Sequence, residues 1–257
     1  MHIFIRRNIT NGTICDDLFE WFQTIYDETR SPNNEFGLYV AISDNASVIS
    51  VSTNNVGGSG SGRFSIFTYN GTAWQFFQAK TFVPGTETFT RTAISQSQSI
   101  VLGLGNSDAA DSNRGETLYY SRNTSDEQWF TPNHEFSYSV STPNDYFNSG
   151  YSVDVSDHDT AIIGSLSAVE GSNIVFIFKK ISPVLWNLTQ TLTTPVTGQH
   201  FFGILVKISR DAQVILVLEA TNPATLQVYK LNSQTQQYSN TGNPITVSTD
   251  NEVLVAG

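Results

Sequence analysis

The chain has 257 residues, a formal net charge of −10 and one cysteine, Cys15. The acidic balance excludes nucleic acid as the expected partner because phosphate binding needs clustered lysine and arginine, and the lone cysteine excludes an internal disulfide. Charged residues make up only 14% of the chain, which favours β-structure with many turns, and no apolar run is long enough to predict membrane insertion.

A strand-like segment at the start, HIFIRR from His2, is followed by a second around Trp21, and a repeat begins after them. Each repeat unit opens with a strand, a four-residue polar turn and a second strand. These strand pairs are Val40 to Val51, Thr92 to Gly103, Val153 to Gly164, Val206 to Val217 and Ile245 to Ala256. A serine recurs at one position, as Ser43, Ser95, Ser156, Ser209 and Ser248. A glycine lies six residues before four of these serines, at Gly37, Gly150, Gly203 and Gly242, whereas the second unit carries Phe89 there.

An aromatic third strand and a tryptophan follow each strand pair. The aromatic position is occupied by Trp74, Trp129, Trp186 and Tyr238, and Trp21 is counted at the same position. Four strands in a period of about fifty residues are typical of a propeller blade. We expect these tryptophans to pack between blades, although a role as platforms for sugar rings is the alternative.

The two ends of the chain contain complementary halves of one unit, because the start lacks a strand pair and the end consists of one. The sequence therefore predicts an all-β, five-bladed β-propeller of four-stranded blades, the last closed by both N- and C-terminal strands. As one domain over 1–257, its blades span approximately 36–88, 89–148, 149–200, 201–240, and 241–257 plus 1–35. The alternative is a fragment of a longer array.

The segments FGLYVAISDNASVISVS, SGYSVDVSDHDTAIIGS and FGILVKISRDAQVILVL resemble FG-GAP repeats, the blades of integrin α-chain propellers and of bacterial and protist surface proteins. The resemblance extends from about Phe36 to the end and implies calcium binding in the first turn of a blade. Only one turn here keeps several carboxylates, Asp157 and Asp159 with Asp154 nearby, against the roughly six to eight oxygens that calcium takes. No cofactor or metal is therefore expected, and these three aspartates are the remaining candidates.

Catalytic patterns are sparse. The four histidines lack zinc-ligand spacing, and there is no G-x-S-x-G motif. A glycoside hydrolase needs two opposed carboxylates, but Asp154 is the only acidic residue within a predicted first strand. The expectation is therefore that the chain is not an enzyme, with a glycoside hydrolase as the third hypothesis.

The first hypothesis is a non-catalytic protein-binding, assembly or adhesion module that presents one rigid propeller face to a protein partner. The loops joining second to third strands, and fourth strands to the next blade, are expected to bring its residues together: Asn54, Asn55, Asp108, Asp111, Asn113, Arg114, His134, Tyr146 and His200. The second is a carbohydrate-binding, lectin-like propeller with a glycan partner, against which the divergence of these loops counts.

Two segments interrupt the regular repeat. The stretch from Asn106 to Glu116 reads either as a cation site or as a solvated turn. The stretch from Phe130 to Phe147 reads either as an added functional element or as an ordinary outer strand. Localisation depends on the start of the chain: an intracellular or virion-associated protein if Met1 is the natural start, and an extracellular or surface protein if the chain belongs to a larger one.

Overall fold

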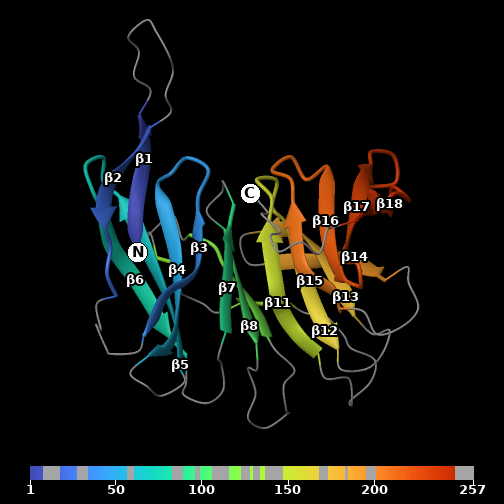
Figure 1. Cartoon of the computed structure of the whole chain (residues 1–257), viewed down its shortest axis with the longest axis horizontal. Helices are drawn as coiled ribbons and strands as arrows, with labels where there is room; N and C mark the ends of the chain where they lie inside the picture. Colours follow the sequence, from blue (N-terminus) through green and yellow to red (C-terminus); the bar gives the residue numbers. More distant parts are fainter. Residues whose placement is uncertain are drawn as a thin grey trace, which may run out of the picture.

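The chain is described from a computed structural model, in which strands are the regular elements of the described residues (Figure 1). The described residues are 1–7, 18–27, 34–56, 61–82, 89–95, 99–105, 116–122, 128–129, 134–136, 147–167, 173–182, 185–194 and 201–246. Within them, no helix is both long and apolar enough to cross a membrane.

The strands form an N-terminal hairpin and four larger sheets. The hairpin pairs β1 (His2–Arg7) with β2 (Leu18–Thr24). Sheet I contains β3 (Glu35–Ile42), β4 (Val48–Val56), β5 (Ser61–Tyr69) and β6 (Trp74–Thr81). Sheet II contains β7 (Phe89–Ile94), β8 (Ile100–Gly105), β9 (Glu116–Tyr120) and β10 (His134–Glu135). Sheet III contains β11 (Phe147–Val155), β12 (Thr160–Ser167), β13 (Ile174–Ser182) and β14 (Leu185–Thr193). Sheet IV contains β15 (Phe201–Ile208), β16 (Val214–Ala220), β17 (Thr225–Asn232), β18 (Gln237–Asn240) and β19 (Ile245–Thr246).

The first strand of each larger sheet is called its inner strand. The four inner strands, β3, β7, β11 and β15, follow one another across the middle of the view (Figure 1), and each contacts the next. Three of them carry a β-bulge at the repeated glycine, where φ is +89° at Gly37, +78° at Gly150 and +85° at Gly203. A side chain disfavours this left-handed conformation, so the repeated glycine supplies it. β7 carries Phe89 instead and pairs with β8 without a register shift.

The repeated serine closes the turn that follows each inner strand. Ser43 Oγ accepts the backbone N–H of Val48 at 3.0 Å, Ser156 Oγ accepts that of Thr160 at 3.1 Å, and Ser209 Oγ accepts that of Val214 at 2.9 Å. The side chain thereby satisfies a turn N–H that the strand ladder does not reach. The repetition of this serine therefore reflects a requirement of the turn.

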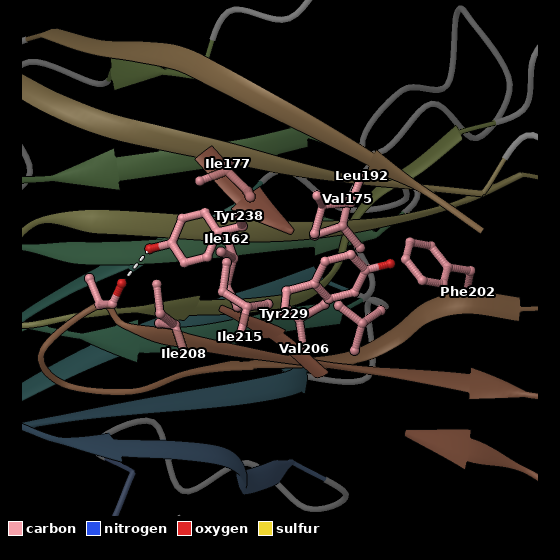
Figure 2. Close-up of a cluster of buried hydrophobic side chains, with 12 residues drawn as sticks. Ile162, Val175, Ile177, Leu192, Phe202, Val206, Ile208, Ile215, Tyr229 and Tyr238 are labelled. Atoms are coloured by element: carbon pink, nitrogen blue, oxygen red, sulfur yellow. Dashed lines mark hydrogen bonds between the residues drawn. The ribbon is translucent and has the colours of Figure 1, made fainter. Parts of the chain in front are cut away.

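Neighbouring sheets are held together by apolar side chains. Between sheets III and IV, Ile162 and Ile177 face Ile215 in one buried cluster (Figure 2). Tyr238 joins this cluster, and its hydroxyl donates to the carbonyl oxygen of Ala212 at 2.6 Å. Burial raises the pKa of Tyr238 to about 12, so the hydroxyl keeps its proton at neutral pH.

The aromatic position of the repeat is buried as expected in four cases, since Trp74, Trp129, Trp186 and Tyr238 are 6%, 1%, 5% and 7% exposed. A glutamine from the preceding sheet binds the backbone of this residue in three repeat units. The Gln23 amide donates to the Trp74 carbonyl at 2.8 Å, and the Gln190 amide donates to that of Tyr238 at 2.7 Å. Gln78 Oε1 accepts the backbone N–H of Trp129 at 3.1 Å.

Trp21 does not occupy the same position, and that prediction was wrong. Trp21 is 62% exposed. It lies two residues before Gln23, whereas Trp186 lies four residues before the equivalent Gln190. The indole N–H of Trp21 donates to Thr24 Oγ1 at 3.2 Å.

The start of the predicted last strand pair is also different from expectation. Ile245 and Thr246 form β19, which pairs with Leu226 and Thr225 of β17. They thus prolong the edge already occupied by β18 instead of opening a new hairpin. The remainder of that predicted pair, 247–256, lies outside the described residues.

Substitution of two glycines by alanine can distinguish the cost of a left-handed backbone from the cost of crowding between two sheets. A Cβ on Gly203 would lie 2.9 Å from Val175 Cγ2 of sheet III, whereas a Cβ on Gly71, at φ +96°, would meet nothing within 4 Å. We expect Gly71→Ala to cost about 1–2 kcal/mol from its left-handed backbone. Gly203→Ala should cost about 1–3 kcal/mol more, because it also overpacks the contact between sheets. Thermal unfolding of both variants checks this, and equal losses of stability would refute the crowding.

Candidate functional site

A cavity of about 550 Å³ lies among the four inner strands and the turns that follow them. β3, β7, β11 and β15 all contribute to its wall. Four residues at one repeat position, two before the repeated serine, line it: Ala41, Ala93, Asp154 and Lys207. The wall is therefore apolar at this level on sheets I and II and charged on sheets III and IV.

Asp154 links β11 to β15. Its Oδ2 accepts the backbone N–H of Ile208 at 2.9 Å and lies 3.8 Å from Lys207 Nζ. Burial raises the pKa of the Asp154 carboxyl above its ordinary value, while the charge of Lys207 and the backbone N–H groups partly oppose that rise. The cavity thus contains a carboxylate with proton affinity above normal beside a cation, the environment in which a carboxylate serves as an acid or base.

The residues directly after the repeated serine form a second level of the wall. Asp44, Asp157 and Arg210 all occupy this position and line the cavity. Arg210 forms an ion pair with Asp44, and its carbonyl oxygen accepts the N–H of Asp157 at 3.0 Å. As a catalytic carboxylate, sequence reasoning counted only Asp154 because it searched within the strands, and it considered Asp157 only for a metal. The fixed offset from the serine was the signal that could have found the others.

Most of the nine residues predicted for a binding face lie outside the described residues. Asn54 and Asn55 lie in β4 and His134 lies in β10. The Asn54 side-chain oxygen is buried and accepts no hydrogen bond in this part of the chain. The other six lie outside the described residues: Asp108, Asp111, Asn113, Arg114, Tyr146 and His200. The predicted face stays a prediction.

The three aspartates considered for a metal are held by different partners. Asp154 lies beside Lys207, whereas Asp159 Oδ2 lies 3.8 Å from Lys180 Nζ. Asp157 lines the cavity from the turn between them. Within the described ranges, no cluster of three or more histidine, cysteine, aspartate or glutamate side chains is arranged to hold a metal ion.

No protein-family model matches the chain, and no curated protein matches it either. Solved structures do share its fold. A Bacteroides fragilis protein assigned as a 6-phosphogluconolactonase aligns with a TM-score of 0.56 at 14% identity, over 96% of this chain and 65% of that one. A structure described with two prolyl endopeptidases gives a TM-score of 0.50 at 10% identity, over 88% of this chain and 31% of that one. The periplasmic gluconolactonase of Pseudomonas aeruginosa gives 0.48 at 11% identity, over 96% and 83%.

The 6-phosphogluconolactonase and prolyl endopeptidase structures are propeller-like, which confirms the all-β, propeller-like fold. The named neighbours above are lactonases or peptidases, and they are not named as FG-GAP proteins. The predicted function as a non-catalytic binding, assembly or adhesion module is contradicted by the comparison with the Bacteroides fragilis structure, which is assigned as a lactonase. That prediction, drawn from the surface-protein habit of FG-GAP relatives, was wrong.

Asp154 gives a pH-dependent prediction for stability. Its raised pKa means that its contribution to folding is fully present below the unfolded value of 3.8 and is lost as pH rises through the folded value. Asp154→Asn keeps an acceptor for Ile208 and does not ionise, so it should gain stability relative to the native chain between pH 4 and neutrality. Asp154→Ala removes the acceptor and should cost about 1–3 kcal/mol. Unfolding of the three proteins across this pH range tests both points, and a pH-independent difference for Asp154→Asn would contradict the first.

Proposed function

We propose that the chain is a hydrolase of small lactones or related esters and that the cavity among the inner strands is its active site. The observation that carries this proposal is the pairing of Asp154, whose pKa is raised by burial, with Lys207 in the cavity wall. Asp154 is the general base, and Lys207 is the cation that stabilises the developing oxyanion.

The reaction needs one water molecule and no other reactant. Asp154 takes a proton from the water while the water oxygen forms a bond to the lactone carbonyl carbon. The carbonyl oxygen becomes an oxyanion, and the Lys207 ammonium stabilises that negative charge. The carbonyl then re-forms as the ring C–O bond breaks, and the leaving oxygen receives the proton that Asp154 holds. The products are a hydroxy acid and an unchanged site.

Two further observations support this class of reaction. The Asp154 carboxylate is already oriented by the Ile208 N–H, so its position costs no further ordering when substrate binds. The neighbour with the higher TM-score is assigned as a 6-phosphogluconolactonase, and at 14% identity it supports the fold and suggests the substrate class tested below.

The test is hydrolysis of glucono-δ-lactone and its 6-phosphate, followed by acid release and corrected for spontaneous hydrolysis. We expect Asp154→Asn to lower kcat/KM by about 10²–10⁴-fold, the usual contribution of a general base. Activity of the native chain should rise as pH passes upward through the raised pKa of Asp154, since only the ionised carboxylate accepts a proton. Lys207→Met should lower kcat as well.

The matched control is Asp211→Asn, because Asp211 is an exposed turn residue outside the wall of this cavity. The control should retain full activity. No hydrolysis by the native chain, or equal activity of the Asp154 and Asp211 variants, would refute the proposal.

We also propose five four-stranded blades of the FG-GAP type, the fifth formed by the N-terminal hairpin and the C-terminal residues that follow Thr246. Two observations support closure of the ring. The Asp44–Arg210 ion pair joins the inner turns of sheets I and IV. On β3, three alternate apolar side chains, Leu38, Val40 and Ile42, are 40%, 51% and 54% exposed among the described residues, which is the pattern of a strand face that a further strand covers.

Substitution of Leu38 tests whether this face is covered. Leu38→Ser should lower the free energy of unfolding by about 2 kcal/mol or more if the C-terminal residues pack on it. Leu188, on the outer strand β14, has the same exposure of 40% and is the control, so Leu188→Ser should change stability by less than about 0.5 kcal/mol. Equal effects of the two substitutions would refute a closed fifth blade.

A further inference from the structure

An arginine lies between two tyrosines across three neighbouring inner strands. The guanidinium carbon of Arg91, on β7, lies 4.7 Å from the ring centroid of Tyr39 on β3 and 4.8 Å from that of Tyr151 on β11. Cation–π attraction to the two rings therefore holds one planar cation from both sides.

The backbone of these strands orients the three side chains. Tyr39 and Tyr151 both lie in the bulges that the glycines Gly37 and Gly150 permit. Ser52 stabilises the first bulge, because its hydroxyl accepts the N–H of Tyr39 at 2.9 Å and donates to the Tyr39 carbonyl at 3.2 Å. β7 has no bulge and presents Arg91 from a regular strand between them. Bulges of this kind redirect side chains beside functional sites.

The N–H groups of Arg91 have no acceptor on the described residues. Its side chain makes the two ring contacts and no hydrogen bond or ion pair within them. Other arginines of the chain are neutralised locally: Arg63 lies 3.5 Å from Asp27, and Arg210 pairs with Asp44. In a chain of net charge −10, it is unusual that no carboxylate of the described residues balances the charge of Arg91, because a guanidinium offers five donors that need acceptors.

We propose that Arg91, held between Tyr39 and Tyr151, is a binding site for an oxyanion of the ligand, a phosphate or a carboxylate. The rings fix the plane of the guanidinium and leave its edge as the donor, which is the geometry that pairs with two oxygens of one anion. This inference rests on the proposed function and refines it, because it makes the substrate an anionic lactone.

The position of the stack suits that role. Tyr151 precedes Asp154 by three residues on β11, roughly 10 Å along a strand, and Arg91 directly precedes Thr92 in the cavity wall. An anion on Arg91 thus lies near the middle of the inner strands, with Asp154 and Lys207 farther along them toward the turns. A phosphorylated sugar lactone has this layout, with its anionic group away from the reacting carbonyl.

Binding is measured by calorimetry on the full chain with compounds that are not turned over. The compounds are inorganic phosphate, glucose 6-phosphate, gluconate, 6-phosphogluconate and, as the neutral reference, glucose. We expect Arg91→Gln to weaken binding of the anionic compounds by about tenfold or more, as for loss of a charge-assisted hydrogen bond. Arg91→Lys should recover part of it, since it keeps the charge without the paired donors. Stronger binding of glucose 6-phosphate than of gluconate identifies phosphate as the group bound, and the reverse order identifies carboxylate.

The matched control is Arg122→Gln, which removes an arginine 5.0 Å from the ring of Trp129, away from the inner strands. It should bind every compound as the native chain does. Tyr151→Leu removes one of the rings that position Arg91 but keeps the guanidinium charge. It should therefore weaken binding less than Arg91→Gln. Binding by Arg91→Gln equal to that of the native chain, or no preference of the native chain for anions over glucose, overturns the site.

The proposed function and this site fail separately. Absence of lactone hydrolysis refutes the enzyme, and Arg91-dependent binding of the anions then still establishes the site. Hydrolysis combined with binding that does not depend on Arg91 refutes the site alone. A KM for lactone hydrolysis of glucono-δ-lactone 6-phosphate that rises in Arg91→Gln, while the KM for glucono-δ-lactone stays constant, supports both the enzyme and the site.

Discussion

Each inner strand has one edge without a neighbouring strand in its own sheet, and the backbone groups on that edge need partners. On β15 the preceding sheet supplies them. Ser152 Oγ accepts the N–H of Val206, and Asp154 Oδ2 accepts that of Ile208, both at 2.9 Å. Between sheets I and II, the hydroxyls of Ser50 on β4 and Thr92 on β7 lie 2.8 Å apart and form a side-chain hydrogen bond. Polar side chains on β11 thus meet this requirement of β15, and one of them brings a buried carboxylate into the cavity wall.

A carboxylate that accepts a backbone N–H has a fixed orientation before any ligand arrives. The same hydrogen bond that joins sheets III and IV thus positions Asp154 beside Lys207. Burial then raises the pKa of Asp154, because the low-polarity surroundings disfavour its charge more than one nearby cation favours it. Structural and chemical roles meet in one residue, which is how a scaffold that needs polar contacts at its centre acquires a reactive group there.

The sequence predicted the features that each unit determines by itself. The glycine at the bulge and the serine at the turn repeat because every inner strand has the same local geometry, and both roles are visible in the structure. The errors concern relations between units. Trp21 was aligned by residue type, while Gln23 shows its true register. Ile245 was predicted to begin a new hairpin, but it pairs with Leu226 of β17 at the edge of sheet IV. The contact of Arg91 with Tyr39 and Tyr151 joins three sheets, so no pattern within one unit could predict it.

The positions at which a sheet departs from the repeat carry the charged residues of the proposed sites. Two residues before the serine, sheets I and II carry alanine, whereas sheets III and IV carry Asp154 and Lys207. Sheet II alone replaces the bulge glycine, by Phe89, and its straight inner strand presents Arg91. A repeated module with equivalent pockets would keep equivalent residues at these positions. A single site along the axis of a repeat protein instead needs each unit to contribute a different group, since every unit approaches that site from a different direction. The inner strands show the second pattern, since the residues of the proposed sites lie at positions where the repeat is broken and not at its regular ones.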